Sequence, residues 1–164
     1  MKLTFHTDYA LRMLIFLAVH EERPSTVSDV ASAYGLSRNH LLKVAFNLGR
    51  LGYVKTTRGR SGGVALAMAP EDINVGAVIR AMEDDFALME CLRPEGGCCV
   101  ITPACRLKGI VRKAIDAFLE VFDAHTLADL VGNRALLAGL LDFPSDPAKT
   151  VSAARRAASG AQSG

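Results

Sequence analysis

The apolar residues of this chain change their spacing near residue 53, and that change limits the folds open to it. Over residues 8–20, 26–34 and 37–51, apolar side chains recur every three or four positions, as on the buried face of an amphipathic helix. The segments 53–56 and 64–68 have the pattern of strands instead, with apolar residues at alternate positions in the second of them. We therefore expect a mainly helical fold with one small β-hairpin.

A glycine lies between the second and third of these helices. Gly35 permits the positive φ of a tight turn, and Ser37 is a residue type that begins helices as an N-cap. Thr7 or Asp8 is expected to cap the first helix in the same way. Two helices joined by a glycine-containing turn form a helix-turn-helix candidate, to which the hairpin adds a wing. The sequence predicts a winged helix-turn-helix region over residues 1–70.

Residues 71–143 form a second predicted region. A short helix over 74–83 is followed by a loop that holds all four cysteines, and then by a long helix from about residue 106 to 130 with one apolar stripe. Because such a helix exceeds what a small domain can cover, we expect two copies of the chain to pair through it as a homodimer. Residues 144–164, rich in Ala, Ser and Gly without periodicity, are expected to be a disordered tail.

The charge of the chain is divided unevenly, although its net value is only +2. Residues 1–70 hold nine Lys or Arg against four Asp or Glu, whereas residues 71–164 hold ten against thirteen. Between Arg38 and Arg60 there are six basic residues and no acidic one. A basic surface indicates a polyanionic partner, and with the helix-turn-helix pattern we expect that partner to be double-stranded DNA.

The third helix and the hairpin carry the predicted contacts to DNA. In helix-turn-helix proteins the N-terminal residues of the second helix of the motif reach base edges in the major groove. Basic residues at a glycine-rich hairpin tip are suited to the minor groove or its phosphates. The predicted DNA-binding residues are Ser37, Arg38, Asn39, His40, Lys43 and Asn47 on the helix, and Arg58 and Arg60 at the tip.

Several other classes of protein are disfavoured. The apolar run from Met13 to Val19 is far shorter than the roughly 20 residues that span a bilayer, and no signal-peptide cleavage site follows it. We therefore expect a cytoplasmic protein that does not contact the membrane. The glycines at 59–63 match neither a P-loop nor a dinucleotide fingerprint, and we expect the chain not to be an enzyme.

The cysteines Cys91, Cys98, Cys99 and Cys105 all lie in one short segment. Since the cytosol keeps thiols reduced, this grouping indicates metal or redox chemistry rather than disulfides. No two of them have the two-residue gap typical of structural zinc sites, whereas thiolates are the main ligands of iron-sulfur clusters. Because Cys98 and Cys99 are adjacent and cannot easily both reach one compact cluster, we expect one of them not to be a ligand.

Several stretches of the chain, from residue 1 to about 143, resemble the winged-helix repressors of the IscR/NsrR superfamily, and most closely its nitric-oxide-sensing branch. Each motif is weak alone, but their order and joint presence are specific. The stretches are MKLTFHTDYALR at 1–12, GLSRNHL at 35–41, RGRSGG at 58–63, CVITPACRLK at 99–108 and TLADL at 126–130.

The resemblance implies an iron-sulfur repressor that binds operator DNA as a homodimer. It assigns three cluster ligands to Cys91, Cys99 and Cys105, and it places the fourth at Asp8, reaching across from the other subunit. His6 is the alternative to Asp8. By the same resemblance, nitric oxide nitrosylates the cluster, and the protein then loses its affinity for DNA.

The cluster type also follows from the resemblance. Members with a 2Fe-2S cluster have a His shortly after the last cysteine, and the residues after Cys105 are Arg106, Leu107, Lys108 and Gly109. We therefore expect a 4Fe-4S cluster, with 2Fe-2S as the alternative.

Two other functions remain open. The first is a regulator of the same fold that senses iron-sulfur status or thiol oxidation, using Cys98 and Cys99 or their neighbours. The second is a small thiol oxidoreductase or cluster-transfer enzyme, which fits poorly because the chain has no Cys-x-x-Cys motif.

Overall fold

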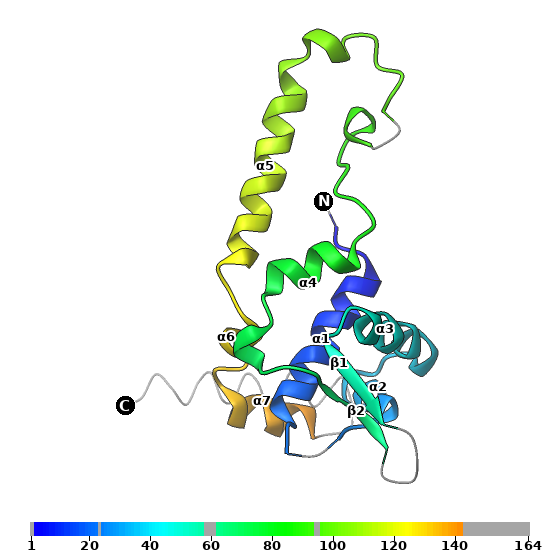
Figure 1. The fold of residues 1–164 in the computed structure, drawn as a ribbon, viewed down its shortest axis with the longest axis vertical. Helices are drawn as coiled ribbons and strands as arrows, with labels where there is room; N and C mark the ends of the chain where they lie inside the picture. The colour runs from blue at the N-terminus through cyan, green and yellow to red at the C-terminus, as the bar shows by residue number, and fades with distance from the viewer. Residues whose placement is uncertain (1, 23, 58–61, 94–95, 143–164) are drawn as a thin grey trace.

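The computed structural model describes residues 2–22, 24–57, 62–93 and 96–142, and it confirms a mainly helical fold with a two-stranded hairpin (Figure 1). Three single 3-10 turns connect the longer elements: η1 (Pro70–Asp72), η2 (Glu90–Leu92) and η3 (Thr102–Ala104). The helices and strands are α1 (Phe5–Val19), α2 (Val27–Tyr34), α3 (Arg38–Arg50), β1 (Val54–Thr57), β2 (Gly63–Leu66), α4 (Val75–Met82), α5 (Arg106–Asp123), α6 (Leu127–Leu130) and α7 (Arg134–Leu141).

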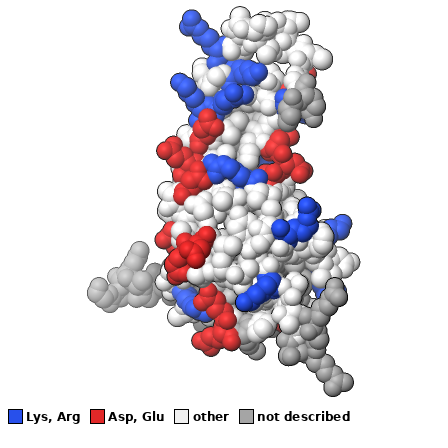
Figure 2. Space-filling model, in the orientation of Figure 1, with Lys and Arg blue, Asp and Glu red and all other residues white. Residues whose placement is uncertain are grey.

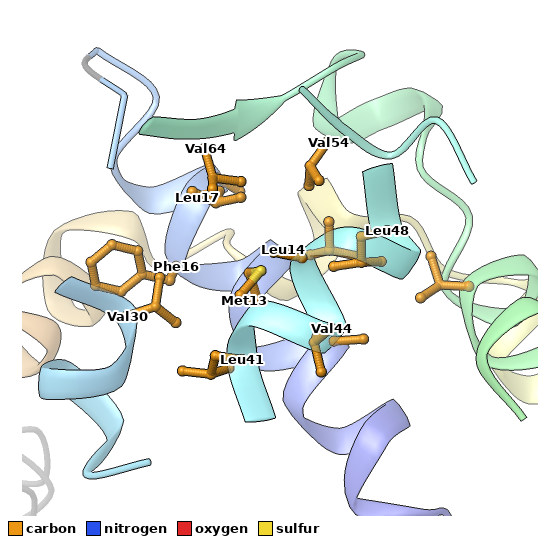
Figure 3. Close-up of a cluster of buried hydrophobic side chains, with 14 of the residues drawn as sticks. Met13, Leu14, Phe16, Leu17, Val30, Leu41, Val44, Leu48, Val54 and Val64 are labelled. Atoms are coloured by element: carbon orange, nitrogen blue, oxygen red, sulfur yellow. The ribbon is translucent and has the colours of Figure 1, made fainter. Parts of the chain in front are cut away.

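The core is built around α1 (Figure 3). Met13 and Leu14 of this helix are completely buried, and so are Leu41 and Leu48 of α3, which pack against them. Val64 of β2 closes the same cluster from the hairpin side. Since α1 also contacts α4, α6 and α7, it joins α3 and the hairpin to the rest of the chain.

The first helix begins three residues earlier than the sequence suggests. Neither Thr7 nor Asp8 is its N-cap, because the Thr4 side chain takes that position and accepts a hydrogen bond from the Thr7 backbone N–H. All three are residue types that can cap. Thr7 is fully buried, so the packing of the first turn against the core selects Thr4.

The helix-turn-helix prediction is confirmed. Thr26 and Asp29 form a capping box at the start of α2, and Gly35 ends that helix with a φ of 63°, a conformation that favours glycine. Ser37 occupies the N-cap position of α3 as expected, although its side chain makes no capping hydrogen bond.

The hairpin follows directly as the wing. Its strands are antiparallel and pair Val54 with Leu66 at one end and Thr57 with Gly63 at the other. Ser25, just before α2, exchanges two backbone hydrogen bonds with Val64, which ties the wing to the helices. A Cβ at Gly63 would lie only 2.8 Å from the Ser25 carbonyl oxygen, so this contact requires glycine.

The predicted single helix from residue 106 to 130 is wrong in its extent. α5 ends at Asp123, and the shorter α6 begins after Thr126 with its own capping box. Tertiary hydrogen bonds cause the break: the Val75 N–H donates to the His125 carbonyl, and the Leu127 N–H donates to the Ile73 carbonyl. The sequence alone does not reveal these bonds.

The predicted helix over 74–83 is confirmed as α4, which packs against the C-terminal half of α5. From there α5 extends away from the winged helix, and residues 84–105 connect its far end to α4 (Figure 1). Among the described residues, no helix combines the length and apolarity needed to cross a bilayer. The predicted tail, 144–164, lies outside the described residues.

Gly76 of α4 lies against the C-terminal end of α5, and its replacement tests that packing. A Cβ at Gly76 would lie 2.9 Å from the backbone nitrogen of Asp123, so Gly76→Ala should lower the free energy of unfolding by about 1–3 kcal/mol. Chemical denaturation measures this. Gly139→Ala in α7, with no atom within 4 Å of its Cβ, is the matched control and should be neutral or stabilising. Equal effects of the two changes would contradict the packing described.

Candidate DNA-binding face and cysteine segment

Helix α3 has one buried and one exposed face. Its buried residues are Leu41, Val44, Ala45 and Leu48. The exposed face carries five of the six residues that are predicted to bind DNA from α3 and its N-cap. No side chain of this face is acidic. These exposed residues are Ser37, Arg38, Asn39, His40 and Lys43. The face therefore offers hydrogen-bond donors and positive charge, which suit phosphates and base edges.

Neighbouring elements orient two of the predicted side chains, Arg38 and His40. Arg38 Nε donates a hydrogen bond of 3.1 Å to Ser28 Oγ on α2. The ring of His40 stacks over Tyr9 of α1, with centroids 6.5 Å apart. Asn47, the sixth predicted position, differs from the rest because it is half-buried.

Two apolar residues on the same face were missed by the sequence analysis. Phe46 is 66% exposed and Leu42 is 40% exposed, one helical turn apart. The signal was present in the sequence, since both positions fall between the basic residues of α3 and off the buried stripe. Apolar side chains on a major-groove helix can contact thymine methyl groups, so both join the candidate contacts.

The predicted contacts at the hairpin tip, Arg58 and Arg60, lie outside the described residues. The paired strands on either side are described up to Thr57 and from Gly63.

All four cysteines are free thiols. Cys91 lies in η2 and is half-buried, and so is Cys105, the N-cap residue of α5. Cys98 and Cys99 are exposed. The Cys98 N–H donates a 3.0 Å hydrogen bond to the carboxylate of Glu90, which folds the segment back on itself.

The single chain does not bring its predicted ligands together. Within the part of the chain that the structure describes, no three His, Cys, Asp or Glu residues are grouped closely enough to hold a metal ion. Asp8, the predicted fourth ligand, is paired with Arg12 through two contacts of 2.9 and 3.0 Å. His6, its alternative, lies against Asn47 of α3.

The chemistry of the cysteine segment nevertheless fits an iron-sulfur group. Its thiols are soft donors, and the hydroxyl oxygen of Thr102 is buried without a hydrogen-bond partner among the described residues. A hydroxyl in that position could donate to a thiolate or a cluster sulfide. The first two turns of α5 add Arg106, Lys108 and Arg112, and basic side chains gather at this end of the molecule (Figure 2).

Asp8 and Arg12 lie beside a tyrosine of α2. Arg12 is 5.9 Å from the centre of the Tyr34 ring. Burial raises the pKa of Tyr34 to about 12; the charge of Arg12 lowers it and that of Asp8 raises it, both by less than the burial effect.

Comparison with known proteins identifies relatives over most of the chain. A family model described as "Rrf2: Iron-dependent Transcriptional regulator" matches residues 3–133. The chain is 51% identical to the HTH-type transcriptional regulator NsrR of Bacillus subtilis over 144 residues, or 86% of this chain and 97% of that protein. It is 49% identical to the regulator of the same name from Geobacillus kaustophilus over 142 residues, which are 86% of this chain and 97% of that protein.

Solved structures share the fold. IscR of T. potens superimposes with a TM-score of 0.65 at 30% identity, over 81% of this chain and 88% of the other. CymR, described as the global cysteine regulator of B. subtilis, gives a TM-score of 0.63 at 30% identity, over 81% of this chain and 98% of the other.

The raised pKa of Tyr34 predicts a loss of stability in alkali. Above the ordinary pKa of 10.0 the unfolded chain loses this proton, whereas the folded chain keeps it up to about pH 12. Unfolding therefore becomes more favourable as pH rises through this window. In Tyr34→Phe, the free energy of unfolding by urea should fall less steeply between pH 10 and about pH 12 than in the wild type. Parallel curves for the two proteins would contradict the assignment.

Proposed function

The chain belongs to the Rrf2 family of transcriptional regulators, and from that premise we propose that it is an iron-sulfur repressor whose binding to operator DNA is relieved by nitric oxide. One observation carries the proposal: about half of the residues are identical to NsrR regulators over 86% of the chain. The family is one of regulators, which confirms that the chain is not an enzyme. A repressor works where the DNA is, so we place it in the cytoplasm.

DNA reading is assigned to α3. Ser37, Arg38, Asn39 and His40 lie at its N-terminal end, which in this motif reaches base edges. Lys43, one turn further along, neutralises phosphate charge. Asn47 contributes by holding α3 in place through its contact with His6 of α1. Arg58 and Arg60 complete the interface as contacts of the wing to the minor groove.

We propose that two copies of the chain pair through α5. Its buried residues, Ile115 and Leu119, face α4, but the helix also carries a second, uncovered stripe at intervals of three and four residues. This stripe consists of Leu107, Ile110, Ala114, Ala117 and Val121, all exposed in the single chain. Such spacing is the seam of helices that pack side by side, and a second α5 is the partner that this symmetry favours.

The cluster is assigned to Cys91, Cys99 and Cys105 of one subunit and Asp8 of the other. No His is present among residues 106–109, directly after Cys105, which supports a 4Fe-4S group in preference to 2Fe-2S. When bound, such a cluster supplies iron with which nitric oxide reacts directly. The residues of the chain then decide the outcome, because a released Asp8 carboxylate has Arg12 as its neighbour one turn away. Pairing with Arg12 stabilises the released state.

One experiment tests the function as a whole. The protein is purified without oxygen, its iron and sulfide are quantified, and its affinity for an operator fragment is measured before and after titration with nitric oxide. We expect four iron and four sulfide per chain, since each chain supplies the three cysteine ligands of one 4Fe-4S cluster, and a fall in affinity on titration. Equal affinity in both states would overturn the proposal.

The role of Lys43 predicts a change in salt dependence. Lys43→Ala should weaken binding to operator and unrelated DNA alike, and reduce the slope of log affinity against log salt by about one. Lys113→Ala on α5 removes the same charge far from α3 and is the matched control. Loss of affinity for the operator alone would show that Lys43 reads bases instead.

The adjacent cysteines give a direct test of the ligand set. Cys99→Ala should lose the cluster, measured as iron per chain and by the visible spectrum, whereas Cys98→Ala should keep it. The reverse result would move the ligand to Cys98. If neither wild type nor variant holds iron and the two exposed thiols oxidise reversibly instead, the alternative function, sensing by thiol oxidation, is supported.

A further inference from the structure

The first turn of α1 is hydrogen-bonded to the base of the cysteine segment. The carboxylate of Glu83 accepts from the Thr4 backbone N–H at 2.8 Å and from the Thr4 hydroxyl at 3.0 Å. Glu83 is the C-cap residue of α4, and the segment with all four cysteines begins immediately after it. Thr4 is the N-cap of α1. Any displacement of that segment at its base therefore acts on the start of α1.

The first two turns of α1 are joined to α3 on the other side of the helix. His6 Nε2 lies 2.8 Å from Asn47 Nδ2, and Tyr9 stacks on His40. His40 and Asn47 are seven residues apart, or about two turns of α3. Since two separate points of α3 are held, the first turns of α1 fix both the position and the tilt of that helix.

We propose that the first turn of α1 transmits the state of the cysteine segment to the DNA-reading helix, with Glu83 and His6 as its positioning residues. The inference rests on the proposed function, because it presumes that cluster and DNA binding are linked. Neither residue contacts DNA or the cluster in this assignment. Each acts through its hydrogen-bond partner, Thr4 in one case and Asn47 in the other.

These contacts are suited to the task because they can open without breaking the core. The apolar contacts between α1 and α3 further along are completely buried, and close-packed interiors do not deform gradually. The contact between His6 and Asn47, in contrast, lines an open hollow of about 470 Å³, together with Thr4, Arg50 and Asp84. The polar end of the α1–α3 interface therefore has room for a second arrangement.

The test compares operator affinity with and without the cluster. The coupling between the sites is measured by a ratio, the dissociation constant without the cluster divided by the dissociation constant with it. His6→Ala, Asn47→Ala and the double variant are loaded with iron and sulfide, and the cluster is checked by its visible spectrum. We expect full loading in all three, and a ratio about fivefold closer to one in each, the effect of one neutral hydrogen bond.

The double-mutant cycle separates coupling from simple structural damage. The double variant should lose no more than either single variant, because both remove one interaction. His6→Gln, which keeps an acceptor for the Asn47 amide, should restore the ratio. Glu83→Ala tests the other side of the turn and should lower the ratio even if His6→Ala proves unstable. Lys43→Ala is the control, since it weakens binding in both states and leaves the ratio unchanged.

The outcomes distinguish this inference from the function on which it rests. A ratio of one in the wild type would overturn the proposed function. A ratio different from one in the wild type that is unchanged in the His6, Asn47 and Glu83 variants would overturn this inference alone. Loss of iron from His6→Ala would make His6 a ligand, and so would also overturn its role as a positioning residue.

Discussion

The burial of α1 is the constraint on which the rest of the structure depends. Its core residues Ala10, Met13 and Leu14 are completely buried, and each large side chain of this kind contributes about 1.5–3 kcal/mol when removed from water. The helix packs against α3 and β2 on one side and against α4, α6 and α7 on others. A movement of α3, β2, α4, α6 or α7 as a unit therefore changes its contact with α1.

This central position is the physical basis of the proposed coupling between the two chemical parts of the molecule. The proposed DNA-reading face is on α3, and the cysteine segment joins α4 to the far end of α5. Both α3 and α4 pack on α1, whose first turn also carries the proposed ligand Asp8. In this proposal the cluster and the DNA-reading face share one helix, and the region they share is the N-terminal end of α1, its most polar and least buried end.

The sequence predicted the helices and hairpin well because their apolar periods and turn residues are local signals. Gly35 indicated the turn and was found with a positive φ. Other features depend on contacts between distant residues. The break after Asp123 follows from hydrogen bonds to residues 73–75, and the half-buried Asn47 from its contact with His6. The ligand set came from resemblance to a family, since the single chain does not gather those residues.

Coupling through α1 is tested most directly by amide hydrogen exchange in the DNA-free, cluster-loaded protein. Exchange is measured before and after reaction with nitric oxide. Because local opening controls exchange, the amides in the first turn of α1 and in α3 should become faster together. A change confined to residues 84–105, with α1 and α3 unaffected, would contradict the claim.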